Sequence, residues 1–159
     1  MSRTGRVERA KRAPATSINV QIASRAKGIP AERSLRLWAR RALIRARPAS
    51  LTLRVVTLNE ARALNHVYRG KDYATNVLTF AYDPLPEGRL HGDIVLCASV
   101  VAAEARRQGK TLPSHYAHLT LHGVLHLQGH DHEHPAEARR MESLEIKLLA
   151  KLGYADPYR

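Results

Sequence analysis

Alternating apolar and polar residues first appear in the chain just after Ser17. Ile18, Val20 and Ile22 alternate with more polar neighbours, and this period of two predicts a strand with one buried face. Three later segments, short and either alternating or largely apolar, predict further strands at residues 51–58 (LTLRVVTL), 77–82 (VLTFAY) and 90–97 (LHGDIVLC). The last of these contains an unbroken apolar run, which is typical of a strand buried on both faces.

Between and after these strands, apolar residues recur at helical spacing. In residues 31–46 they form one face that contains Leu35, Trp38, Ala39 and Ala42, while arginines occupy much of the remaining surface. We expect Trp38 to be a core residue because it lies in the middle of this apolar face. Four further helices are predicted at residues 60–67, capped by Asn59, and at residues 99–108, 112–128 and 135–152.

The last of these helices has clear start and stop signals. Pro135 fits its first turn, where the missing backbone N–H has no partner to lose, and Gly153 fits its end. Its core-facing stripe is expected to consist of Ala138, Met141, Leu144, Leu148 and Leu152.

The order of these elements predicts an α+β fold, a mixed four-stranded sheet packed with about five helices. Residues 83–88 (DPLPEG) form a turn by composition, so the strands on either side should pair as an antiparallel hairpin. The early strand-helix-strand unit favours a right-handed parallel crossover. A chain of 159 residues suits one domain, which we place at residues 17–159, after a basic tail at residues 1–16 that we expect to be disordered.

Charge narrows the choice of partner. The chain carries 26 Lys and Arg against 14 Asp and Glu, which gives a formal net charge of +12. Such an excess favours a polyanion, nucleic acid ahead of a membrane surface. No apolar run approaches the ~20 residues that cross a bilayer, so no membrane association is expected.

The cysteine content and the first residues bear on the compartment. One cysteine, Cys97, excludes an intramolecular disulfide and suits a reducing environment, so we expect a cytoplasmic protein. The early basic residues lead into no apolar core, which argues against a secretory signal. An organelle transit peptide and a disordered basic tail both fit this stretch. Cys97 itself fits a small buried residue or a thiolate near a metal.

Seven of the nine histidines lie between residues 115 and 134, which predicts a metal site on a helix in the C-terminal half and the loop that follows it. His122 and His126 stand four residues apart, so a helix places both on one face. Gly129 can end that helix in a left-handed turn, and His132 can then supply a third nitrogen. Three imidazoles leave one position of a tetrahedral Zn²⁺ open, as in catalytic sites, and other divalent metals also suit imidazole.

The neighbouring polar residues have more than one interpretation. His130 could compete with His132 for the metal, or it could line the pocket and donate a proton to a leaving group. Asp131 could orient a ligand imidazole, act as a base, or form an Asx turn after the helix. His115 and His118 lie upstream on the same helical face, and we expect them to be hydrogen-bonded or surface residues.

The spacing H-x-x-x-H-x-x-G-x-x-H is also that of the metzincin proteases, which carry a general-base Glu directly after the first His. Gly123 occupies that position here, so a peptidase would lack its usual proton acceptor. A three-histidine zinc still lowers the pKa of bound water to about 7 and supports hydrolysis. Together with the basic charge, this favours a phosphodiester in RNA or DNA as the substrate. Arg69 is the candidate cation for charge that develops on phosphorus, and an ordinary surface arginine is the alternative.

Four motifs together resemble one known family. They are H-G-V-L-H-L-Q-G-H-D-H (122–132), L-N-H-V-Y-R-G-K-D-Y-A-T-N-V-L-T-F (64–80), H-G-D-I-V-L-C (91–97) and E-A-R-R-M-E-S-L-E (137–145). Over about residues 50–158, the chain resembles the YbeY family of bacterial ribosome-maturation endoribonucleases.

The resemblance implies a metal-dependent endoribonuclease specific for single-stranded RNA. It would act in the maturation of small-subunit ribosomal RNA, at the 3′ end, and in ribosome quality control, with the small ribosomal subunit and assembly factors as partners. His122, His126 and His132 match the family's zinc ligands, and Arg69 matches its functionally important arginine. The chain departs from the usual pattern at His130, where Tyr is usual, at Ala74, where Pro is usual, and at Thr79, where Ser is common.

A zinc-dependent endoribonuclease is therefore our leading hypothesis. The alternative is a ribosome-assembly factor that binds RNA and whose metal is structural, with Asp131 or Cys97 as the fourth ligand. A metallopeptidase is the third possibility, and Gly123 makes it the least favoured.

Overall fold

The computed structural model describes residues 15–44, 47–130 and 133–159, so nearly all of the predicted tail lies outside the described residues. The elements are β1 (Ser17–Ile22), α1 (Glu32–Ala42), β2 (Ala49–Val56), α2 (Leu58–Arg69), β3 (Val77–Ala81), a 3-10 turn (Pro86–Gly88), β4 (Leu90–Cys97), α3 (Ala98–Arg107), α4 (Leu112–Leu127) and α5 (Pro135–Lys151). The predicted α+β class is confirmed.

The strands form one mixed sheet in the order β1-β2-β4-β3. β1 pairs parallel with β2, and β2 pairs parallel with β4, while β3 pairs antiparallel with β4. Both predicted pairings, the early parallel unit and the later antiparallel hairpin, are therefore confirmed. β4 lies inside the sheet, which leaves β3 as an edge strand.

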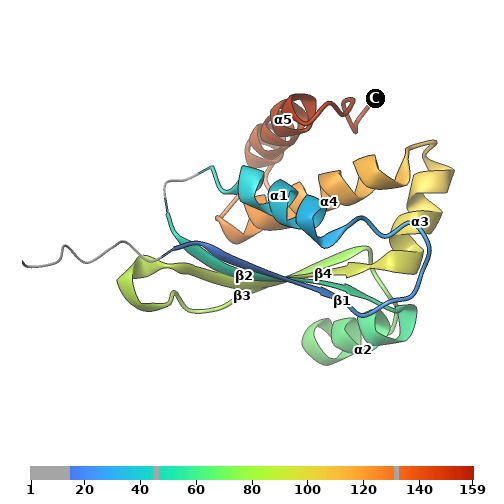
Figure 1. Ribbon diagram of the computed structural model, residues 1–159, viewed down its shortest axis with the longest axis horizontal. Coiled ribbons are helices and arrows are strands. Elements are labelled where there is room, and N and C mark those ends of the chain that lie inside the picture. Colours follow the sequence, from blue (N-terminus) through green and yellow to red (C-terminus); the bar gives the residue numbers. More distant parts are fainter. Residues whose placement is uncertain (1–14, 45–46, 131–132) are drawn as a thin grey trace, which may run out of the picture.

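The helices lie in layers on the two faces of the sheet (Figure 1). α1 and α4 cover one face, and α2 covers the other. α5 packs against α4 on the side away from the sheet, so α4 is enclosed between the sheet and an outer helix. This position lets α4 present one side to the core and another side to α3 and α5 (Figure 1).

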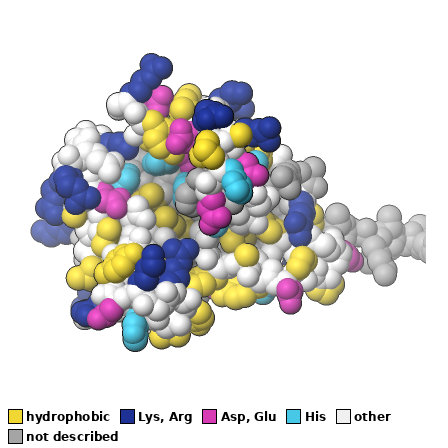
Figure 2. Space-filling model, turned by 180° about the vertical axis from the view of Figure 1, so that it is seen from behind, with side chains coloured by type: hydrophobic (Ala, Val, Ile, Leu, Met, Phe, Trp, Pro, Cys, Tyr) yellow, Lys and Arg dark blue, Asp and Glu magenta, His cyan; other side chains and the backbone are white. Residues whose placement is uncertain are grey.

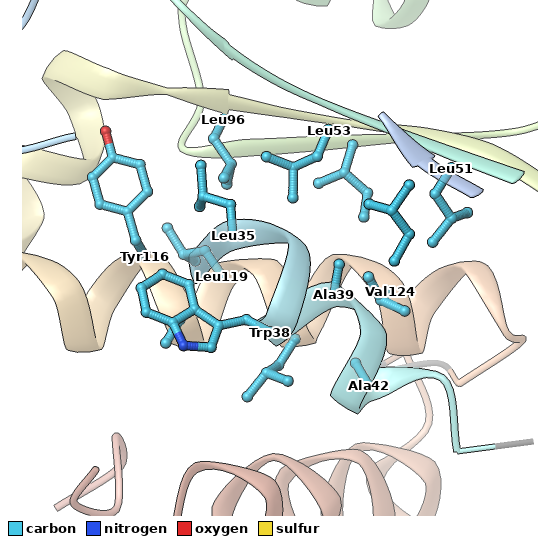
Figure 3. Close-up of a cluster of buried hydrophobic side chains, with 14 of the residues drawn as sticks. Leu35, Trp38, Ala39, Ala42, Leu51, Leu53, Leu96, Tyr116, Leu119 and Val124 are labelled. Atoms are coloured by element: carbon cyan, nitrogen blue, oxygen red, sulfur yellow. The ribbon is translucent and has the colours of Figure 1, made fainter. Parts of the chain in front are cut away.

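The main core fills the space between the sheet and the pair α1 and α4 (Figure 3). Leu35, Trp38 and Ala39 of α1 are buried there, opposite Leu51 and Leu53 of β2. Trp38 is 5% exposed, which confirms its predicted place in the core. Burying such side chains is the main source of stability, at roughly 25 cal/mol for each Å² of apolar surface removed from water.

A second, smaller cluster lies on the other face of the sheet, beneath α2. It contains Val95 and Cys97 of β4, whereas Ile94 and Leu96 of the same strand belong to the main core. β4 is therefore buried on both faces, as its unbroken apolar run predicted. Cys97 is a small buried residue that packs on the opposite face of the sheet from α4.

Two helix boundaries differ from the predicted ones. α2 begins before Asn59, and its cap is Thr57, whose side chain accepts a hydrogen bond from the Glu60 backbone nitrogen at 3.3 Å. α1 ends at Ala42 instead of continuing to residue 46. The Gln128 side chain donates to the Ala42 carbonyl oxygen at 2.6 Å, which takes the place of a further helical hydrogen bond.

The predicted stripe of α5 is partly wrong. Met141 is buried as expected, but the other fully buried positions are Glu145 and Leu149, while Leu144 and Leu148 are only half-buried. The helix is rotated so that a carboxylate, and not a leucine, faces α4. No helix among the described residues is long and apolar enough to cross a membrane.

Two glycines, Gly92 and Gly123, allow α4 and β4 to approach closely, and a methyl group would be tolerated differently at the two positions. A methyl group at Gly92 would lie 2.9 Å from the Phe80 carbonyl oxygen and 2.9 Å from Leu127. A methyl group at Gly123, in α4, would lie 3.0 Å from the flexible side chain of Ile94.

We expect Gly92→Ala to lower the free energy of unfolding by about 1–3 kcal/mol, because the neighbouring backbone cannot move aside without distorting the sheet. Gly123→Ala should cost less, because Ala improves helix propensity by about 1 kcal/mol. Urea denaturation of both variants measures the difference. A loss for Gly92→Ala that is equal to or smaller than the loss for Gly123→Ala would contradict this expectation.

Candidate metal centre

α4 carries four histidines along one side, His115, His118, His122 and His126. The helix begins at a Thr111 cap, whose side chain accepts from the Ser114 backbone nitrogen at 3.3 Å. The ring centroids of His115 and His118 are 6.4 Å apart, and those of His118 and His122 are 6.3 Å apart. Figure 2 shows histidine side chains gathered on the upper part of one face, with acidic side chains next to them and Lys and Arg around them.

The end of α4 reverses the chain, as the sequence predicted. Gly129 has a φ of 91°, which is the left-handed region that glycine adopts without strain. Its backbone nitrogen donates to the His126 carbonyl oxygen at 3.0 Å, and the His130 nitrogen donates to the Leu125 carbonyl oxygen at 3.2 Å. This pair of bonds is a Schellman motif, and it turns the chain back directly after His126.

The side chain that organises the histidines is Glu145 of α5, which is fully buried. His122 Nδ1 donates to its Oε1 at 2.6 Å, and His118 Nε2 donates to its Oε2 at 3.0 Å. The hydroxyl of Tyr158 also donates to Oε2. Burial alone would raise the pKa of this carboxyl, but the three hydrogen bonds outweigh burial and lower the pKa to about 2.

An ionised carboxylate only accepts hydrogen bonds, so each imidazole that contacts it must present an N–H. His122 therefore carries its proton on Nδ1, which leaves Nε2 as the nitrogen with a lone pair. Metal-binding histidines in proteins are usually held in this way, with the second nitrogen bound to a carboxylate or carbonyl. This donor chemistry fits a metal that is bound through His122 Nε2.

A second carboxylate serves the first histidine of the line. Glu104 of α3 accepts from His115 Nε2 at 2.7 Å and from the Asn76 side-chain amide at 3.1 Å. Burial lowers the pKa of His115, and the nearby Glu104 offsets this effect only in part. His115 and His118 are thus hydrogen-bonded, which was one of the two expectations for them.

The structure places some of the predicted site residues and not others. His122 and His126 lie one turn apart on α4, and both are half-buried. His130 follows the turn at Gly129 and lines a cavity of about 770 Å³ between that turn and α5. Asp131 and His132 lie outside the described residues. Within the described part of the chain, no three His, Cys, Asp or Glu side chains are grouped so that they could hold a metal ion.

The helix predicted at residues 60–67 is longer in the structure and includes Arg69. Arg69 is the last residue of α2 and not part of the following loop, since the helix ends at Gly70 with a φ of 67°. Its side chain is exposed, and it forms no hydrogen bond or ion pair with any other residue in the described ranges. α2 and α4 lie on opposite faces of the sheet (Figure 1), and no hydrogen bond or ion pair joins Arg69 to a histidine within the described ranges.

The geometry agrees with what comparison with known proteins finds. Residues 20–153 match the family described as Endoribonuclease YbeY. This chain belongs to the YbeY family. The resemblance that the motifs predicted is therefore confirmed, and it extends upstream of residue 50 to include α1 and the second half of β1.

Several relatives carry the name Endoribonuclease YbeY. The Cupriavidus necator protein is 56% identical over 131 residues, which are 82% of this chain and 65% of that protein. The Methylobacillus flagellatus protein is 54% identical over 145 residues, which are 91% of this chain and 95% of that protein. The solution structure of Thermotoga maritima TM1509 has a TM-score of 0.54 at 24% identity, covers 85% of this chain and 91% of its own, and supports the fold.

Sequence reasoning missed the carboxylates of this YbeY site. Glu145 lies four residues after Met141 and four before Leu149, so the helical period places it on the buried face of α5. An acidic residue in an apolar stripe is a signal that could have been noticed, because a buried charge needs partners. Glu104 gave no comparable signal, since the apolar residues of α3 form a less clear stripe at helical spacing.

The buried His115 predicts a measurable pH dependence. Because its pKa is lowered in the folded protein, the unfolded chain binds the proton more strongly. Its contribution to stability is therefore present above the ordinary histidine pKa of 6.5 and is lost as the pH falls below that value.

We expect His115→Gln to flatten the dependence of the unfolding free energy on pH between about 7.5 and about 5.5, since Gln can still donate to Glu104 but does not titrate there. Denaturant titrations at several pH values measure it. The exposed His134→Gln is the control. Equal changes of the pH dependence in the two variants would show that the burial of His115 is not the cause.

Proposed function

We propose that this chain is a zinc-dependent, single-strand-specific endoribonuclease. It would act in the cytoplasm on small-subunit ribosomal RNA, in 3′-end maturation and in ribosome quality control, together with the small subunit and assembly factors. The observation that carries the proposal is the carboxylate-held His122, one turn from His126, in a chain of the YbeY family. Relatives named endoribonucleases support RNA as the substrate.

His122, His126 and His132 would hold the zinc ion. When bound, zinc acts as a Lewis acid and lowers the pKa of water, which is the chemistry that phosphodiester hydrolysis needs at neutral pH. Glu145 holds the ring of His122. His130 and Asp131 are the proposed groups for proton transfer, and Arg69 is the proposed phosphate contact on α2. A single RNA strand that reaches both α4 and α2 would pass over β3, the edge strand.

The cavity next to His130 offers positive charge for the RNA backbone. It is lined by Arg139, Arg140 and Lys147 of α5, and by one carboxylate, Glu137. None of these three cations forms an ion pair within 4.0 Å among the described residues. Three cations against one carboxylate, beside the turn that follows His126, suit the phosphates that flank a scissile bond.

The metallopeptidase and the structural metal bound through Cys97 lose support, whereas a structural metal with Asp131 as its fourth ligand stays a prediction, because Asp131 lies outside the described residues. A metzincin-like base would stand at position 123, but Gly123 packs against Ile94 and Thr79, where even a methyl group is crowded. A structural metal with Cys97 as its fourth ligand would require that residue near α4, and it packs on the opposite face of the sheet.

The first experiment removes a proposed ligand. We expect His126→Ala, or treatment of the wild-type protein with a chelator, to reduce strongly the cleavage of single-stranded RNA. The reduction should exceed the about 10- to 100-fold loss that is typical when a residue hydrogen-bonded to a metal ligand is replaced. Metal analysis should show loss of bound zinc in His126→Ala. The control is His134→Ala, an exposed residue of the same loop. Wild-type cleavage rates in His126→Ala would exclude the proposal.

The second experiment tests the cavity. We expect Arg139→Glu combined with Lys147→Glu to raise KM for RNA with little change in kcat, because these residues would bind phosphates away from the cleaved bond. The slope of log affinity against log salt should become shallower by about 0.7 for each phosphate that is no longer neutralised. Arg106→Glu combined with Arg107→Glu, on exposed positions of α3, changes the net charge equally. Equal effects in both double variants would indicate general charge and not a site.

A further inference from the structure

The C-terminal segment reaches the histidine network through Tyr158. Its hydroxyl donates to Glu145 Oε2 and lies 3.4 Å from His118 Nε2. Its ring packs edge-on against His118, with centroids 5.5 Å apart and an interplanar angle of 83°. Burial and the neighbouring Glu145 carboxylate raise the pKa of Tyr158, so its hydroxyl stays protonated and remains a donor.

The segment that carries Tyr158 is itself held in place. The side chain of Lys110, in the turn between α3 and α4, donates to the Pro157 carbonyl oxygen at 2.7 Å. The backbone nitrogen of Tyr158 donates to the Asp156 side chain at 2.8 Å. The end of the chain is therefore fixed against the start of α4, and the hydroxyl of Tyr158 is directed at Glu145.

The two carboxylate oxygens of Glu145 have different tasks. Oε1 accepts from His122, and Oε2 accepts from both His118 and Tyr158. Donors on Oε2 restrict rotation of the carboxylate, and this restriction fixes Oε1 against His122 Nδ1. A buried carboxylate with fewer donors would be less well solvated by the protein and would be less stable in this orientation.

We infer that Glu145 and Tyr158 are positioning residues for metal binding. Together they hold the His122 ring in the Nδ1–H tautomer and in one orientation, so that Nε2 is the nitrogen offered to the metal. The inference rests on the proposed metal site, and it assigns to the last turn of the chain a role in a site that lies on α4. Neither residue contacts substrate in this scheme.

Glu104 and His115 form a matched reference pair. They are a half-buried carboxylate on α3 and a buried imidazole on α4, and the hydrogen bond between them is 2.7 Å long. His115 lies about two turns of α4 before His122. The change Glu104→Gln therefore removes the same chemical group without touching a proposed ligand, and it separates a positioning role from a purely structural one.

The experiment measures zinc affinity by competition with a chromophoric chelator, without RNA. We expect about 10- to 100-fold weaker binding in Glu145→Gln, a smaller loss in Tyr158→Phe, and affinity within about threefold of wild type in Glu104→Gln. Nitrogen-15 NMR of the metal-free proteins should show His122 as the Nδ1–H tautomer in the wild type and a mixture of tautomers in Glu145→Gln.

Two outcomes overturn the inference. One is wild-type zinc affinity and an unchanged His122 tautomer in both Glu145→Gln and Tyr158→Phe. The other is a loss of zinc affinity in Glu104→Gln as large as that in Glu145→Gln. Such a result would mean that zinc affinity falls with any loss of protein stability, and not through the orientation of His122. If Glu145→Gln does not fold, Tyr158→Phe decides alone, since it removes only one hydroxyl.

The failure of this inference is distinguishable from failure of the proposed function. A wild-type protein that binds zinc tightly but leaves single-stranded RNA intact contradicts the nuclease, whereas the affinities of the variants still test positioning. If the wild type binds no zinc, the proposed metal site and the inference that rests on it are both wrong.

Discussion

The burial of the Glu145 carboxylate is the constraint on which the candidate site depends. An isolated charge in the protein interior costs several kcal/mol, and it is tolerated only when donors replace water. His118, His122 and Tyr158 supply those donors, and they come from α4 and from the C-terminal segment. α4, α5 and the C-terminal segment are thereby fixed to one another at the place where the histidines lie.

α4 can take part in this arrangement because its sides are divided between two tasks. Leu121 and Val124 are buried in the core next to the sheet, and Gly123 allows the helix to lie close to β4. The histidines occupy the side that faces α3 and α5. The rigid sheet therefore holds the backbone, while the carboxylates orient the imidazoles, which is how a metal site gains its geometry from residues behind the ligands.

The same layering separates the parts of the proposed nuclease. The histidines and the cations of α5 lie together on one side of the sheet, and Arg69 lies on α2 on the other (Figure 1). A flexible single strand can bend over an edge strand, whereas a stiff duplex cannot do so cheaply. The arrangement is thus consistent with the preference for single-stranded RNA that we propose.

The sequence by itself determined the features that depend on local period and spacing. These are the α+β class, the two strand pairings, the helical pair His122 and His126, the turn at Gly129, and the family. The roles of Asp131 and His132 stay predictions, because both residues lie outside the described ranges. Only the tertiary structure decided that Glu145 and Tyr158 join the histidines. Glu145 lies 23 residues from His122 and 13 from Tyr158 along the chain, and the rotation of α5, which local propensity does not encode, brings them together.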